Sequence, residues 1–278
     1  MLTTVSLIIA FFAYGSASWL LFQFIKRSGI QQFGQTTTET SLLTQALVVA
    51  VIAVIAHITY AILVSQVGGL LNFSFSSMSV LISAILVVIY LIACAWMPIR
   101  RLGVLVYPFT ILTLACSALW NSDANLLVDR GFAFNTHILV AILAYCLLTI
   151  ATIQSLLYCY QEYQFKQRRK PSLLLALPPL QTMETLLFRL IGLGFVLLTF
   201  TLISGAIFSQ QIFGHAFEFK HHTILAVVGW CVFAYLLIQR FRNGLRGNSA
   251  VAWTVCGFMF IQLGYFGTKL VTESLASA

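Results

Sequence analysis

The chain has 278 residues and a formal net charge of +8, but charged residues make up only 8% of it and hydrophobic residues 60%. A soluble domain of ordinary composition carries about 25% charged residues, so this sequence excludes a soluble globular protein. In a bilayer, lipid rather than water solvates the apolar outer faces of helices. The basic residues also lie in separate short loops, so we expect the lipid bilayer as a partner and no nucleic acid.

Apolar segments follow one another along the chain, each near the length of about 20 residues that a helix needs to cross a bilayer. They lie near residues 2–24, 42–65, 76–97, 102–120, 135–160, 184–208, 222–239 and 250–270. The first segment lacks the basic leading region and the cleavage site of a signal peptide, so we expect a mature helix. The sequence predicts an all-α fold, a polytopic transmembrane helical bundle of about eight helices, in a single integral membrane domain over residues 1–278.

Basic residues are distributed unevenly between the two sets of loops that connect these segments. One set holds only Arg130, Lys220 and Lys269. The positive-inside rule places the other, richer set in the cytoplasm, which puts both termini on the extracytoplasmic side of a bacterial cytoplasmic (inner) membrane. The richer set consists of Lys26, Arg27, Arg100, Arg101, Lys166, Arg168, Arg169, Lys170, Arg240, Arg242 and Arg246.

The segment 68–79, in the first extracytoplasmic loop, mixes leucine and phenylalanine with serine and asparagine. This mixture is typical of a short helix that lies in the plane of the membrane interface. We expect such a helix there.

Six cysteines lie within or at the edges of apolar segments, without a C-x-x-C pair, a zinc pattern or a covalent haem-attachment motif. Free cysteine in such a setting is a small buried hydrophobe, so a thiol–disulfide carrier is not expected. The sequence also has no serine nucleophile elbow, phosphate loop or paired-acid pattern. We therefore expect no hydrolytic, ATP-dependent or thiol redox enzyme.

The five histidines all fall in the outer half of the predicted bundle. His57 lies inside the second span, about 12 Å below its outer end at 1.5 Å per residue. His137 lies at the outer start of the fifth span, and His215, His221 and His222 lie at or before the start of the seventh. An ionisable group inside the membrane is a functional candidate, although a neutral imidazole also serves as a hydrogen-bonding link between helices. Both interpretations stay open for His57.

Haem suits these histidines better than a bare metal ion does. Zinc sites need thiolates or carboxylates beside the imidazoles. Glu218 is the only acid close in sequence to the histidines at the start of the seventh span. Haem iron takes neutral imidazole as an axial ligand, and its macrocycle needs apolar, aromatic surroundings, which Trp120 and neighbouring phenylalanines supply. Arg130 and Lys220 are candidates to pair with haem propionates at the rim.

Segments of the chain, most of them in its second half, carry a family likeness. They are Thr136–Tyr145, Leu177–Glu184, Gly194–Gly205, His222–Trp230, Gly244–Gly247 and Tyr265–Gly267. On these segments the chain resembles the cytochrome c assembly superfamily of membrane haem-handling proteins, and within it the small inner-membrane YpjD/HemX-like type, which is related to CcsA and CcmC. The resemblance is strongest over residues 130–270.

The resemblance implies haem b, bound non-covalently, and partners among the cytochrome c biogenesis proteins. By resemblance, His57 corresponds to an intramembrane ligand of the haem iron and His137 to an outer-face ligand. His221 lies where relatives of this type often carry a histidine. His221 or His222 is then the candidate to pair with His137 across the fifth and seventh helices.

Three features depart from the larger, haem-transporting members. Residues 209–220 contain no tryptophan, no second intramembrane histidine lies near Ile238 and Gln239, and no histidine follows Tyr265–Gly267. Two functions therefore stay open: haem binding or handling linked to c-type cytochrome assembly, and a membrane regulatory or scaffold protein that keeps the family fold without transporting haem. A third alternative is transport of another solute or ion through the bundle, although the lack of buried acids in the spans argues against coupling to a cation.

Overall fold

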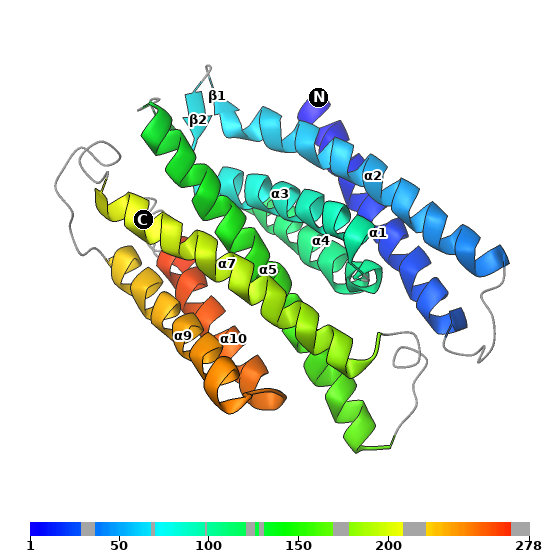
Figure 1. Ribbon diagram of the computed structural model, residues 1–278. Helices are drawn as coiled ribbons and strands as arrows, with labels where there is room; N and C mark the ends of the chain where they lie inside the picture. Colours follow the sequence, from blue (N-terminus) through cyan, green and yellow to red (C-terminus); the bar gives the residue numbers. More distant parts are fainter. Residues whose placement is uncertain are drawn as a thin grey trace. The chain divides into compact units, whose positions relative to one another are not determined.

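The computed structural model describes residues 1–28, 37–67, 70–97, 99–120, 126–127, 131–168, 178–207 and 221–267. Within these ranges, eight helices are long and apolar enough to cross a membrane (Figure 1), which confirms the predicted number and the all-helical class. The chain divides into two compact units. Unit 1 comprises Met1–Asn121 and Tyr160–Thr182, and unit 2 comprises Ser122–Cys159 and Met183–Ala278. The single membrane domain expected from the sequence stays a prediction.

Unit 1 is built on four spans. Helix α1 packs against α2 and α4, and α3 packs against the same two helices. Helix α3 is the most deeply buried span of those described, and large tyrosine side chains from α1, α3 and α4 fill the interior. The elements are α1 (Leu2–Ser28), α2 (Thr37–Ser65), α3 (Phe75–Trp96), the 3-10 turn η1 (Arg100–Leu102) and α4 (Gly103–Leu119).

The connection between α2 and α3 differs from the expected interfacial helix. Strand β1 (Gln66–Val67) pairs antiparallel with β2 (Leu70–Asn72), and α3 begins three residues later. The side chain of Ser74 caps α3 by accepting a hydrogen bond from the Ser77 backbone N–H, and Asn72 Nδ2 donates to Ser77 Oγ at 3.0 Å. The prediction of a separate helix over 68–79 was wrong, because this capping network starts the transmembrane helix itself at Phe75.

Unit 2 contains most of the second half of the chain. Helix α9 packs against α10 and against the π-helical turn η2, which follows α10 in the chain. Glycines allow the close approach: a Cβ at Gly257 would lie 2.9 Å from the Phe233 ring, and one at Gly229 would lie 3.1 Å from the Gly257 carbonyl oxygen. The elements are strand β3 (Leu126–Leu127), α5 (Phe132–Lys166, in this unit up to Cys159), α7 (Leu180–Ile207), α9 (His221–Asn243), α10 (Asn248–Gln262) and η2 (Leu263–Gly267).

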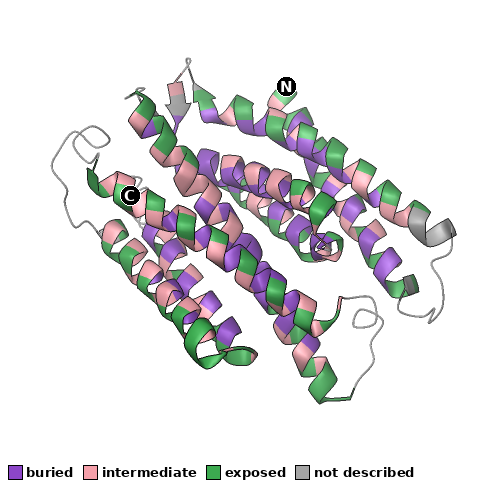
Figure 2. Ribbon diagram, viewed as in Figure 1, coloured by how far each residue is buried: buried purple, intermediate pink, exposed green. Residues whose placement is uncertain are grey.

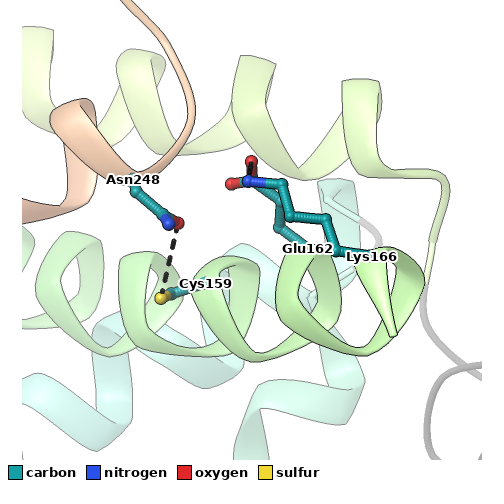
Figure 3. Close-up of polar contacts among 4 residues, drawn as sticks. All are labelled: Cys159, Glu162, Lys166 and Asn248. Atoms are coloured by element: carbon teal, nitrogen blue, oxygen red, sulfur yellow. Dashed lines mark hydrogen bonds and ion pairs between the residues drawn. The ribbon is translucent and has the colours of Figure 1, made fainter. Parts of the chain in front are cut away.

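Helix α5 begins three residues before the span expected at 135–160 and ends six residues after it. At its C-terminal end, Lys166 Nζ pairs with Glu162 across one helical turn at 2.7 Å (Figure 3), a spacing that stabilises a helix. Earlier in α5, Cys159 Sγ lies 3.7 Å from Oδ1 of Asn248, the first residue of α10 (Figure 3). Polar residues therefore continue the helix beyond its apolar part.

Residues coloured as exposed lie along the spans of both units (Figure 2), and many of them are large and apolar. Phe12 on α1 is 71% exposed, and Phe200 on α7 is 58% exposed. Such exposure is unfavourable in water but costs nothing against lipid tails, which are equally apolar. The burial pattern agrees with a multi-pass membrane protein.

Candidate functional site

His137 lies in the second turn of α5 and is half-buried against α7. Its Nδ1 atom lies 2.9 Å from Ser204 Oγ, and Ser204 Oγ donates its own proton to the carbonyl oxygen of Thr201 at 3.1 Å. Ser204 therefore accepts the Nδ1–H proton of His137. This pattern assigns the tautomer whose lone pair is on Nε2. Metal-ligating histidines have the same arrangement, in which one ring nitrogen donates to a neighbouring oxygen and the other binds the metal.

A glycine lets the His137 ring lie close to α7. A Cβ atom at Gly205 would lie 3.2 Å from His137 Cε1, which is tighter than ordinary van der Waals contact. The hydrogen bond to Ser204 and the absence of a side chain at Gly205 together fix the orientation of the imidazole. Both residues lie on α7, where Ser204 is 67 positions from His137 in sequence, and the sequence interpretation did not identify them.

The structure describes the other residues predicted to act with His137 only in part. His222 lies in the first turn of α9, is exposed, and packs its backbone carbonyl beside Gly264 of η2. His221 begins α9, but its side chain lies outside the described residues, as do Arg130, His215 and Lys220 entirely. The start of α9 and His137 both belong to unit 2.

Trp120 belongs to unit 1 rather than to the unit that contains His137. It is the C-cap residue of α4, and its ring centroid lies 6.0 Å from that of Phe75 at the start of α3. The described contacts therefore bring Trp120 together with Phe75, and its predicted role beside haem stays a prediction.

Unit 2 has its own aromatic side chains with polar contacts. Trp230 on α9 donates from Nε1 to Thr199 Oγ1 at 2.8 Å and stacks on Phe195, with ring centroids 5.5 Å apart. Tyr145 on α5 donates a short hydrogen bond to Gln262 at the end of α10. These contacts join α7 to α9 and α5 to α10. Sequence reasoning missed them because they depend on how the helices pack.

His57 lies in the interior of unit 1 and is completely buried. Its Nδ1 atom lies 3.2 Å from the hydroxyl of Tyr14 on α1, and its Nε2 atom lies 3.3 Å from Ser83 Oγ on α3. The Tyr14 ring meets the imidazole edge-on, with centroids 5.8 Å apart, and Tyr107 of α4 stacks on Tyr14. Neither Tyr14 nor Ser83 was identified from the sequence, although both are polar residues inside apolar spans.

The two histidines differ in how well they fit a haem ligand. His137 has one nitrogen held by a neighbouring oxygen and is partly accessible, which fits an axial imidazole. Both ring nitrogens of His57 are engaged inside a packed core, which does not fit. Among the described residues, no group of three or more histidine, cysteine or acidic side chains could hold a bare metal ion.

Comparison with known proteins agrees with the sequence resemblance. A family model described as cytochrome C assembly protein matches residues 40–276. The chain is 28% identical over 172 residues to inner membrane protein YpjD of Escherichia coli K12, which covers 62% of this chain and 64% of YpjD. It is 27% identical over 143 residues to the cytochrome c biogenesis protein CcsA of Chlamydomonas reinhardtii, covering 51% of this chain and 39% of CcsA.

Protein HemX of Brevibacillus brevis is 26% identical over 132 residues, 48% of each chain. The matched part of the chain thus spans less than two thirds of the length of these relatives. No solved structure matches the chain. Because the family model covers most of its length, the chain belongs to the cytochrome c assembly protein family.

Proposed function

We propose that this protein binds or handles haem in the bacterial inner membrane and serves the assembly of c-type cytochromes. The observation that carries the proposal is the hydrogen bond between His137 and Ser204, which holds a half-buried imidazole in one orientation at the start of α5, in a chain that belongs to the cytochrome c assembly protein family. The names of the relatives support the same setting, since one is an inner membrane protein and another a cytochrome c biogenesis protein. The bound group would be haem b, held non-covalently.

In the proposed site, His137 provides one axial ligand at the outer end of unit 2. His221 and His222 at the start of α9 are candidates for a second ligand, and Arg130 is a candidate for contact with the propionates. When bound, haem would supply a redox-active iron. The protein's own part is to hold the imidazole in one orientation, through Ser204.

The test is a haem titration of the detergent-purified protein, followed by absorption spectra of the oxidised and reduced forms. We expect a saturable low-spin spectrum in the wild-type protein that is lost or strongly weakened in His137→Ala. Thr136→Ala is the matched control, because Thr136 is an exposed neighbour on the same helical turn. Absence of a saturable spectrum in the wild-type protein, or an equal loss in Thr136→Ala, would contradict the proposal.

A second candidate function is that of a regulatory or scaffold protein without haem. The lack of tryptophan in residues 209–220 favours it, because the tryptophan-rich loop of the larger members is missing. The two functions predict different results when variants are expressed in cells that lack the chromosomal gene for this protein. A His137→Ala variant that restores full c-type cytochrome levels would favour the scaffold, whereas one that fails although it is present at wild-type abundance would favour haem handling.

A further inference from the structure

The environment of His57 departs from what a haem ligand requires. His57 and Tyr14 have no exposed surface, and Ser83 is only 2% exposed. The three side chains come from α2, α1 and α3 and meet in the interior of unit 1. They therefore form a contact among three membrane-spanning helices, which we call the His57 junction.

The hydrogen bonds of His57 with Ser83 and Tyr14 follow from the position of the Ser83 hydroxyl, and the Val80 backbone contributes a further hydrogen bond to His57. Ser83 Oγ donates to the carbonyl oxygen of Val80 at 3.0 Å, so it accepts the Nε2–H proton of His57 at 3.3 Å. The Nδ1 lone pair then accepts the hydroxyl proton of Tyr14 at 3.2 Å. Every polar atom of a neutral imidazole is satisfied in this arrangement, as a buried polar group in the membrane requires.

An iron ligand needs a nitrogen lone pair directed at the metal and an open face for the macrocycle. In the His57 junction, the Nδ1 lone pair is directed at Tyr14, and the Tyr14 ring is backed by Tyr107, with centroids 5.7 Å apart. Tyr107 in turn meets Tyr90 at 5.9 Å, and Tyr90 donates to the carbonyl oxygen of Arg100 at 2.7 Å. Haem ligation by His57 would require this packed column of tyrosines to be displaced.

We infer that His57 is a positioning residue, the hydrogen-bonded junction of α1, α2 and α3, and not an iron ligand. Unit 1 is then a scaffold that holds its four spans together. Insofar as the inference concerns haem, it rests on the proposed function, and it limits the haem of that function to unit 2. One haem per chain is expected rather than two.

The test compares substitutions that separate hydrogen bonding from ligation. In His57→Gln, the side-chain amide can still accept from Tyr14 and donate to Ser83, but it does not provide a haem ligand of the imidazole type. In His57→Leu, neither hydrogen bond is possible. We expect the melting temperature of the purified full-length protein to fall by several degrees in His57→Leu and to be largely recovered in His57→Gln. The haem-to-protein ratio of His57→Gln should equal that of the wild type.

A double-mutant cycle adds a readout that does not depend on haem. Tyr14→Phe should lower the melting temperature in the wild-type background but have little further effect in His57→Leu, because the bond that it removes is already lost. If His57→Leu does not fold, His57→Phe, which also lacks both hydrogen bonds, replaces it in the cycle. Additive effects of the two substitutions would overturn the junction.

The inference that His57 is not an iron ligand is tested separately by the amount of haem bound. A haem-to-protein ratio that falls by half in His57→Gln, or loss of the low-spin spectrum at an unchanged melting temperature, would show that His57 is a ligand and overturn the inference. If the wild-type protein binds no haem, the proposed function fails by itself. In that case the double-mutant cycle alone supports or overturns the junction.

Discussion

Arg240, in the last turn of α9, forms an ion pair with Glu184 near the start of α7. The guanidinium also lies over the Phe188 ring, 4.5 Å from its centroid, and donates from Nη1 to the carbonyl oxygen of Leu245 at 3.2 Å. Leu245 belongs to the turn between α9 and α10, which Gly244 and Gly247 form with positive φ angles of 65° and 68°. A single arginine thus joins α7 to the α9–α10 turn.

We expect Arg240→Ala to destabilise the protein by roughly 1–3 kcal/mol, because it removes an ion pair, a cation–π contact and a hydrogen bond from a partly buried position. Arg240→Lys should lie between the wild type and alanine, since an ammonium group cannot reproduce the planar contacts. Denaturant unfolding in detergent measures the difference. Arg242→Ala is the matched control, because Arg242 is exposed on the same helical turn. An equal effect of both alanine substitutions would show that Arg240 acts only through its charge.

A glycine at the start of α4 controls the packing of unit 1. A Cβ atom at Gly103 would lie 2.6 Å from Leu21 Cδ1 and 2.7 Å from the Tyr90 hydroxyl. Gly103→Ala should therefore destabilise the protein by about 1–3 kcal/mol through overpacking, although alanine favours a helix. Gly15→Ala is the contrasting variant, because nothing lies within 4 Å of the position of a Cβ atom there. We expect its free energy of unfolding to stay unchanged or to rise by up to ~1 kcal/mol. A melting experiment in which both variants changed in the same direction would contradict this reasoning.

The number and positions of the spans could be predicted from the sequence because the requirement for about 20 apolar residues is local. Helix ends were less predictable. The ion pair of Lys166 with Glu162 stabilises the end of α5. A pattern of apolar residues does not detect a helix end of this kind. The turn between α2 and α3 was missed because its structure depends on side-chain bonds among Asn72, Ser74 and Ser77, which a hydrophobicity pattern does not contain.

The candidate site was only partly predictable for the same kind of reason. His137 could be selected from its position at the start of an apolar span and from the family resemblance, but its partner Ser204 lies 67 residues away. No spacing rule connects the two, since their contact depends on the packing of α5 against α7. His57 shows the converse. Its position inside a span fits a ligand and a hydrogen-bonding link equally well, and only the contacts with Tyr14 and Ser83 separate them.

Ser204 should matter for haem affinity without touching the iron. Removing the hydrogen-bond partner of a ligating histidine typically weakens metal binding by about 10- to 100-fold, and we expect an effect of that order for Ser204→Ala in a haem titration. Thr201→Ala is the control, because the Thr201 hydroxyl donates only to the carbonyl oxygen of Leu197 in its own helix. If Ser204→Ala bound haem as tightly as Thr201→Ala, the assigned tautomer of His137 would have no role in binding.

The orientation of the chain in the membrane gives a further prediction. Lysines and arginines concentrate in the loops that follow the odd-numbered spans, so the α9–α10 turn with Arg246 should lie in the cytoplasm and the start of α5 outside. In a variant with its six native cysteines replaced, a membrane-impermeant maleimide added to intact cells should label Phe132→Cys, since Phe132 is 86% exposed at the outer end of α5. Arg246→Cys should be labelled only after the membrane is permeabilised. The reverse pattern would place the His137 end of unit 2 in the cytoplasm, and haem capture at the outer face would then be excluded for this protein.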